Sequence, residues 1–279
     1  NLELFSNSIK QLLNNTTINN SILSLILTPP SYRTFQNNLS NYDPLDLYDM
    51  RNCYLIKFYK NLEDDLYNLF KNLLEKFYIN SDLKIRSLIK ILLEALCTID
   101  NNFAKNIAEE FCDSKIMEIK MIGLTSCIKY NHSNSINLLK KFYSEFQNDK
   151  IVLEKWFQIR SSYNNSYFDG INSIKDILKN KNFEYKNPNF VRAIFSSFQG
   201  NNIELFHAKD GSGYKFVTDQ IIIIDKINPQ TAARIITPMT NISKFNDITK
   251  NRIKRYLKKI INSNPSNDVF EVVSKVLGQ

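Results

Sequence analysis

The sequence predicts an all-α fold, and two observations carry that prediction. Glycine and proline are scarce, with 6 and 7 among 279 residues, whereas sheet-rich proteins turn often and need more of both. Apolar residues also recur at the i, i+3, i+4 spacing that gives a helix one buried face. Hydrophobic residues at 43% and charged residues at 23% give the balance of a soluble globular protein.

Three amphipathic runs define the pattern, at Leu83–Leu96, Ile116–Ile128 and Ile136–Phe146. Short polar stretches such as Asp100–Asn102 separate them. Helices joined by loops this short pack as antiparallel pairs, and stacked pairs form an α-solenoid that curves into a superhelical bowl. No strict sequence repeat is present, so the repetition is structural only. We expect one helical-repeat domain over residues 1–279.

Predicted helix starts share a pair of residues, an Asp or Asn followed by Pro. The pair occurs at Asp43–Pro44, Asn187–Pro188 and Asn228–Pro229, with Asn264–Pro265–Ser266 as a variant. The Asp or Asn side chain accepts a hydrogen bond from the first turn. Proline then occupies a position whose N–H has no helical partner.

Three segments are harder to assign. The four isoleucines Ile221–Ile224 favour a strand by propensity, but we predict helix, because both neighbours are helical and a lone strand has no partner. Gly200–Tyr214 holds three of the six glycines and is predicted to be a long loop. The longest apolar run, Ile22–Leu27, is too short to span a membrane and is predicted to be a core segment.

A formal charge of +8 and a pI of about 9.1 raise the question of an anionic partner. The basic residues are spread along the chain, and Asn, Ile and Lys are the residues that AT-rich codons encode, so we expect no nucleic-acid partner. One local cluster lies between Lys244 and Lys259, with apolar residues interleaved. This pattern predicts an amphipathic helix with a solvated basic face.

The four cysteines, Cys53, Cys97, Cys112 and Cys127, form no C-x-x-C pair. We interpret them as reduced core thiols of a cytoplasmic protein. The first residue is Asn1 rather than Met, and no targeting segment follows it, so we expect a piece of a longer protein.

The histidines exclude a zinc-protease motif within this sequence. Its two histidines are His132 and His207, and neither precedes Glu, whereas H-E-x-x-H places two imidazoles on one metal. We expect His132 on a surface loop and His207 to pack a loop rather than to catalyse. No G-x-S-x-G is present, and Asp210–Gly213 lacks the Lys-Ser/Thr of a phosphate loop, so a tight turn is expected there.

Several motifs follow one another in the order of one enzyme family. Phe206–Tyr214 resembles an F-H-A-x-D-G-S-G-Y stretch, and Asn228–Arg234 resembles N-P-Q-x-A-x-R. Further matches lie at Leu25–Ser31, Asp43–Pro44, Lys155–Phe157, Lys186–Arg192 and Val269–Leu277. Through these motifs nearly the whole chain resembles the C-terminal helical domain of the aminopeptidase N (alanyl aminopeptidase) family, in its bacterial type.

The resemblance implies a zinc aminopeptidase that releases N-terminal residues from peptides. Its H-E-x-x-H motif, distal Glu and G-A-M-E-N motif would precede this region, so zinc would be bound outside this chain. This chain would hold no catalytic residue and no metal, and we expect it to be inactive alone. Its expected partners are the catalytic and N-terminal domains of the same polypeptide and the peptide substrate, whose access to the active-site cavity it would limit.

The resemblance also supplies candidate site residues. Arg192 and Arg234 match arginines that face the family's cavity, and Gln230 lies one turn before Arg234 on the same face. Arginine can bind a peptide's carboxylate through two parallel N–H donors. A role in anchoring helix ends is the alternative. The residues expected to shape the preceding loop are His207, Asp210, Gly211, Gly213 and Tyr214.

Two other functions remain open from the sequence. A helical-repeat scaffold that binds proteins would have no zinc-protease motif upstream of this region. A binder of nucleic acid or of another anionic surface would lose affinity steeply as the salt concentration rises.

Overall fold

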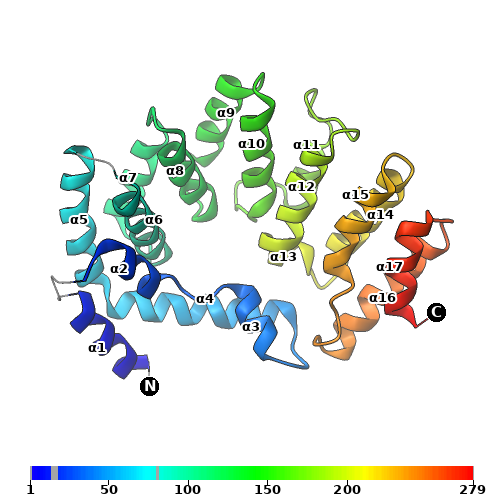
Figure 1. Cartoon of the computed structure of the whole chain (residues 1–279), viewed down its shortest axis with the longest axis horizontal. Helices are drawn as coiled ribbons and strands as arrows, with labels where there is room; N and C mark the ends of the chain where they lie inside the picture. Colours follow the sequence, from blue (N-terminus) through cyan, green and yellow to red (C-terminus); the bar gives the residue numbers. More distant parts are fainter. Residues whose placement is uncertain (1, 14–17, 80–81, 279) are drawn as a thin grey trace. The chain divides into compact units, whose positions relative to one another are not determined.

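The computed structural model describes residues 2–13, 18–79 and 82–278, and all regular elements in these ranges are helices (Figure 1). The prediction of an all-α fold is therefore confirmed. The chain forms two compact units, one of Asn1–Thr34 and Asp49–Leu138, the other of Phe35–Tyr48 and Leu139–Gln279. The expectation of a single domain stays a prediction.

The first unit packs consecutive helices against each other. Its helices are α1 (Leu2–Leu13), α2 (Asn20–Leu27), most of α4 (Pro44–Asn61), α5 (Glu63–Ile79), α6 (Leu83–Thr98), α7 (Asn102–Phe111) and α8 (Met117–Lys129). Helix α6 lies between α5 and α2, and α7 packs on α8. The core is fully buried at Leu66, Phe70, Leu88 and Leu92, which removes apolar surface from water and stabilises the unit.

The second unit has a larger continuous core. Its helices are α9 (Ser135–Phe146, shared with the first unit), α10 (Lys150–Ser162), α11 (Gly170–Ile177), α12 (Pro188–Asn201), α13 (Ile203–Phe206), α14 (Ser212–Asp225), α15 (Pro229–Ile236), the 3₁₀ turn η1 (Thr237–Met239), α16 (Asp247–Ile261) and α17 (Asn267–Leu277). Helix α10 packs on α12, and α14 lies against both α15 and α16. Edge-to-face aromatic pairs join this core, with ring centroids 5.9 Å apart for Phe198–Phe206 and 5.2 Å for Phe206–Tyr214.

An early segment of the chain packs into the second unit. It follows α3 (Tyr32–Asn38). The Tyr42 N–H donates to the Lys244 carbonyl at 3.3 Å, and the Asn246 N–H donates back to the Tyr42 carbonyl at 2.8 Å. The Asp43 carboxylate then accepts from the Thr249 hydroxyl at 3.2 Å. These bonds hold residues 35–48 against the start of α16.

Most of the predicted helix starts are confirmed. Asp43 accepts from the Leu45 N–H at 2.9 Å, Asn187 from the Asn189 N–H at 3.0 Å, and Asn228 from the Thr231 N–H at 3.0 Å. At Asn264–Pro265–Ser266 a helix does start, but its cap is Ser266 rather than the residue before the proline. Ser266 caps α17, and Asn264 has φ 52°. The Asp225 carboxylate fixes that cap by accepting from the Ser266 N–H at 2.8 Å.

The three difficult segments had different outcomes. Ile221–Ile224 is helical within α14, as predicted. The prediction of one long loop over Gly200–Tyr214 is wrong. Helix α12 continues to Asn201, α13 begins at Ile203, and α14 begins at Ser212. The run Ile22–Leu27 is only partly core. Helix α2 carries apolar residues on more than one face, so Leu23 and Leu27 are buried while Leu25 is 79% exposed.

The basic cluster forms the predicted amphipathic helix α16. Its apolar face buries Ile253, Tyr256 and Leu257, while Arg255 and Lys258 are exposed. Within the described ranges, no helix is long and apolar enough to cross a membrane.

Candidate functional site

Helix α15 carries two of the three predicted peptide-binding side chains. Gln230 and Arg234 are both exposed, and their i, i+4 spacing places them on one face. Within the part of the chain that the structure describes, neither side chain has a hydrogen-bond or ion-pair partner. A guanidinium and an amide on one exposed face can together bind a carboxylate and a neighbouring carbonyl.

The third predicted side chain, Arg192, lies along its own helix. Its Nε donates to the Pro188 carbonyl at 3.3 Å, and its guanidinium also donates to the Asn189 side chain. Both partners belong to the first turn of α12. These are the contacts of a helix-end anchor, the alternative role considered for this residue.

Arg192 and Arg234 lie on different helices. Helices α12 and α15 are tied where the Gln199 amide donates to the Ile235 carbonyl at 3.0 Å. Arg234 is next to that contact, whereas Arg192 is seven residues from Gln199, about 10 Å along α12. A ligand that touched both arginines would have to extend over several ångströms.

His207 and Tyr214 are brought together in the core of the second unit. His207 Nδ1 and the Tyr214 hydroxyl are 2.6 Å apart, and both side chains are buried. Burial lowers the pKa of His207 to about 3. The Asp43 carboxylate opposes this shift, whereas the Arg252 guanidinium adds to it. The imidazole is therefore neutral at physiological pH, and burial raises the pKa of Tyr214.

Asp210 and the two glycines build the turn between α13 and α14. The Asp210 carboxylate accepts from the Ser212 N–H at 2.9 Å, and this hydrogen bond lowers its pKa. Gly211 has φ 78°, and a Cβ there would lie 2.8 Å from the Tyr256 hydroxyl. A Cβ on Gly213 would lie 2.2 Å from the Leu205 carbonyl oxygen, so only glycine lets these two backbone segments meet.

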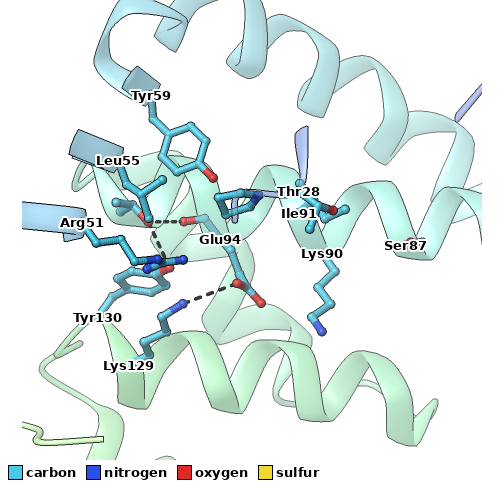
Figure 2. Close-up of a pocket in the computed structure, with 12 residues that line it drawn as sticks. Thr28, Arg51, Leu55, Tyr59, Ser87, Lys90, Ile91, Glu94, Lys129 and Tyr130 are labelled. Atoms are coloured by element: carbon cyan, nitrogen blue, oxygen red, sulfur yellow. Dashed lines mark hydrogen bonds and ion pairs between the residues drawn. The ribbon is translucent and has the colours of Figure 1, made fainter. Parts of the chain in front are cut away.

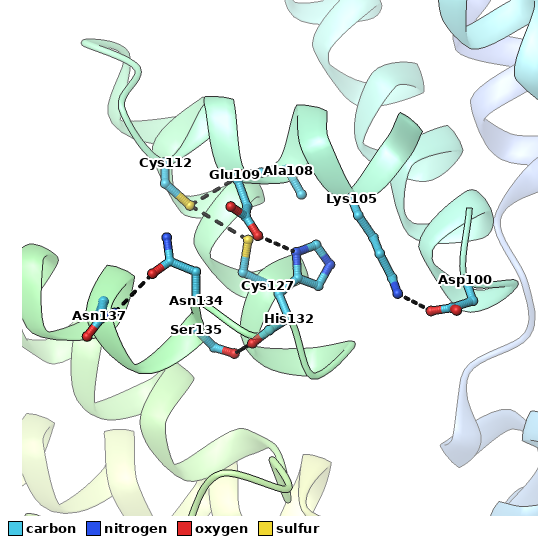
Figure 3. Close-up of polar contacts among 10 residues, drawn as sticks. All are labelled: Asp100, Lys105, Ala108, Glu109, Cys112, Cys127, His132, Asn134, Ser135 and Asn137. Atoms are coloured by element: carbon cyan, nitrogen blue, oxygen red, sulfur yellow. Dashed lines mark hydrogen bonds and ion pairs between the residues drawn. The ribbon is translucent and has the colours of Figure 1, made fainter. Parts of the chain in front are cut away.

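His132 is buried, so its predicted surface position is wrong. It lies in the turn between α8 and α9, yet is only 4% exposed, and its Nδ1 is 3.5 Å from Glu109 Oε1 (Figure 3). Burial lowers the pKa of His132, and the Glu109 carboxylate opposes that shift. The sequence predicted the loop at His132 correctly, but it could not show that Glu109 of α7 lies against the ring.

Three of the four cysteines are core thiols, as predicted, and Cys53 is exposed instead. The Cys112 and Cys127 sulfurs lie 3.9 Å apart, and Cys112 Sγ contacts the Ala108 carbonyl at 3.3 Å (Figure 3). Burial raises the pKa of Cys97 to about 12. The Cys127 pKa is raised by its contact with Cys112 and then by burial.

Thiol labelling should follow this difference in exposure. Because the thiolate is the reactive form, we expect iodoacetamide at pH 8 to alkylate Cys53 at least tenfold faster than Cys97, Cys112 or Cys127. Peptide mass spectrometry of a time course measures the four rates. The unfolded chain in urea is the control and should label all four alike. Equal rates in the native chain would contradict the burial of these thiols.

A pocket in the first unit was not predicted from the sequence. It has a volume of about 280 Å³, and α2, α4, α6 and α8 supply its walls (Figure 2). Its lining residues are Thr28, Pro29, Arg51, Leu55, Tyr59, Ser87, Lys90, Ile91, Glu94, Thr98, Lys129 and Tyr130. Thr28 and Pro29 belong to the Leu25–Ser31 motif of the sequence analysis. That motif is the one sequence feature that pointed to this part of the chain.

Among the described residues, no group of three or more His, Cys, Asp or Glu side chains is placed to hold a metal ion.

Three curated proteins similar to this chain are named aminopeptidase N. It is 34% identical to aminopeptidase N of Haemophilus influenzae over 141 residues, which is 50% of this chain and 16% of that protein. It is 32% identical to the Caulobacter vibrioides enzyme over 50% of this chain and 16% of that protein. It is 23% identical to the Escherichia coli enzyme over 61% and 20%. The matched part is thus a fifth or less of each relative, and the predicted resemblance to aminopeptidase N is confirmed.

A solved structure has the same fold. Legionella pneumophila aminopeptidase A, in complex with aspartic acid, matches with a TM-score of 0.85 at 24% identity, over 99% of this chain and 36% of that one. The family described as "Domain of unknown function (DUF3458_C) ARM repeats" matches residues 2–278. Armadillo repeats are stacked helices, so the predicted α-solenoid is confirmed. The chain belongs to this DUF3458_C family of ARM-repeat domains.

Proposed function

We propose that this chain is the helical domain of a zinc aminopeptidase and that it borders the cavity in which peptides bind. The observation that supports this most is the ordered series of motifs together with relatives that are named aminopeptidase N. Zinc and the catalytic carboxylate would belong to the rest of the enzyme. The contribution of this domain is to limit access and to bind the peptide.

Within the domain, we propose Arg234 and Gln230 as the peptide-binding pair. Both side chains are exposed and uncommitted among the described residues, so no existing contact has to be broken for binding. Arg192 would have a secondary part, because its guanidinium already bonds to the first turn of α12. His207, Asp210, Gly211, Gly213 and Tyr214 would act indirectly, by fixing the turn that leads into α14.

The test is reconstitution of the enzyme. The catalytic part of the parent enzyme is mixed with this chain, and hydrolysis is followed for an alanine-linked chromogenic substrate and for a short peptide. We expect peptide turnover to rise only in the mixture. If the catalytic part alone works equally well on both substrates, the domain is a scaffold and the proposal is wrong.

Arg234→Ala should weaken peptide hydrolysis selectively. Loss of a charge-assisted hydrogen bond to the peptide carboxylate is expected to raise KM for the peptide about tenfold. The chromogenic substrate has no such carboxylate and should be unaffected. Arg33→Ala, which removes an exposed arginine from α3, is the matched control. Equal loss on both substrates would indicate a structural role for Arg234.

A further inference from the structure

The pocket in the first unit combines an excess of positive charge with an apolar wall. Its charged lining residues are three cations, Arg51, Lys90 and Lys129, and one anion, Glu94. Lys129 Nζ is 3.4 Å from Glu94 Oε2, which offsets one positive charge. The lining therefore has a net charge of about +2, and in a recess with low-dielectric walls such an excess attracts anions.

Arg51 is held in place at this pocket. Its Nε donates to the Pro30 carbonyl at 3.1 Å, which fixes the side chain against the segment that follows α2. In Figure 2 the Lys129 ammonium contacts the Glu94 carboxylate, Arg51 lies on the same side of Glu94, and Lys90 extends on its other side. An arginine restrained in this way loses less side-chain entropy when it binds a carboxylate.

Two tyrosines add neutral donors. Burial raises the pKa of both Tyr59 and Tyr130, so their hydroxyls stay protonated at physiological pH. The Tyr130 hydroxyl lies 3.0 Å from the Thr98 hydroxyl, which also contacts the Glu94 carbonyl at 2.7 Å. These contacts orient Tyr130 at the pocket wall.

The remaining wall is apolar, with Pro29, Leu55 and Ile91. A volume of about 280 Å³ suits a small molecule rather than a chain segment. We propose that this pocket binds a small aliphatic carboxylate. Its carboxylate group would bind Arg51, and its apolar alkyl group would pack against Leu55 and Ile91. The proposal does not depend on the peptide-binding role of α15, because every lining residue belongs to the first unit.

The test is titration of the full chain at low salt with 4-methylpentanoate, 4-methylpentanamide and inorganic phosphate, followed by calorimetry. We expect saturable binding of the carboxylate, with the amide and phosphate each at least about tenfold weaker. 4-Methylpentanamide lacks the negative charge of the carboxylate, and phosphate lacks the apolar alkyl group. Equal affinity for acid and amide, phosphate binding as tightly as the acid, or no saturation at about 50 mM would each overturn the proposal.

Variants locate the site. Arg51→Gln should weaken 4-methylpentanoate binding about tenfold, and Ile91→Asn should weaken it severalfold by disturbing the apolar wall. Because Arg51 also bonds to Pro30, its replacement can disturb the fold. Lys90→Glu is therefore the second charge variant, since Lys90 is exposed, and it should weaken binding severalfold. Arg33→Glu is the control, because it changes the net charge by the same two units at an exposed residue that does not line the pocket. If it weakens binding as much as Lys90→Glu does, the effect is only net charge and the proposal is wrong.

Discussion

Gly213→Ala is expected to lower the free energy of unfolding by about 3 kcal/mol, near the upper end for overpacking. The new Cβ would lie 2.2 Å from the Leu205 carbonyl oxygen and 2.4 Å from that of Phe206. Both are backbone atoms, so relief requires α13 to move away from α14. That movement would also separate His207 from Tyr214, whose contact is 2.6 Å. Alanine's better helix propensity, about 1 kcal/mol over glycine, does not offset these losses.

Gly200→Ala is the matched control for that prediction. Gly200 lies in the last turn of α12, it is exposed, and no atom lies within 4 Å of a Cβ built there. This substitution should be neutral or stabilising by up to about 1 kcal/mol. Urea denaturation monitored by circular dichroism at 222 nm measures both variants. If the two alanines change the unfolding midpoint alike, the close approach at Gly213 is not what stabilises this turn.

The parts of the fold that the sequence predicted are set by local interactions. The Asx–Pro starts at Asn187 and Asn228 need only the first turn of the helix to form their caps. Likewise, Ile221–Ile224 is helical because burial of Ile221 and Ile224 on one face outweighs their β propensity. Local patterns of this kind can be read without knowing which segments meet.

The features of the fold that the sequence did not predict depend on contacts between segments far apart in the chain. Lys244 Nζ donates to the Asn37 carbonyl at 2.5 Å across 207 positions, and no periodicity indicates that pairing. The glycines near Gly213 suggested a loop, although they serve close packing of α13, α14 and Tyr256. For the candidate site, the resemblance supplied Arg192, Gln230 and Arg234, but only the structure shows that the Arg192 guanidinium is hydrogen-bonded within its own helix.

Acid is expected to destabilise the chain through His207 at pH values where carboxylates are still ionised. Its folded pKa of about 3 lies below the ordinary value of 6.5, so between these pH values the unfolded chain binds more protons than the native one. The contribution of His207 to the free energy of unfolding is therefore present above pH 6.5 and is lost as the pH falls below that value. For one such histidine the loss from pH 7 to pH 5 is about 2 kcal/mol.

The variant His207→Gln should remove that part of the pH dependence. Glutamine does not titrate and can still hydrogen-bond the Tyr214 hydroxyl, so the variant should be less stable at pH 7 but lose about 2 kcal/mol less between pH 7 and pH 5. His132→Gln is the comparison, since burial also lowers the pKa of His132 and its effect should add independently. Asp43 and Asp210 have lowered pKa values, so their contributions are lost only below this window. Urea midpoints at half-unit pH steps measure the slopes, and an unchanged slope in His207→Gln would mean that His207 is protonated in the native core.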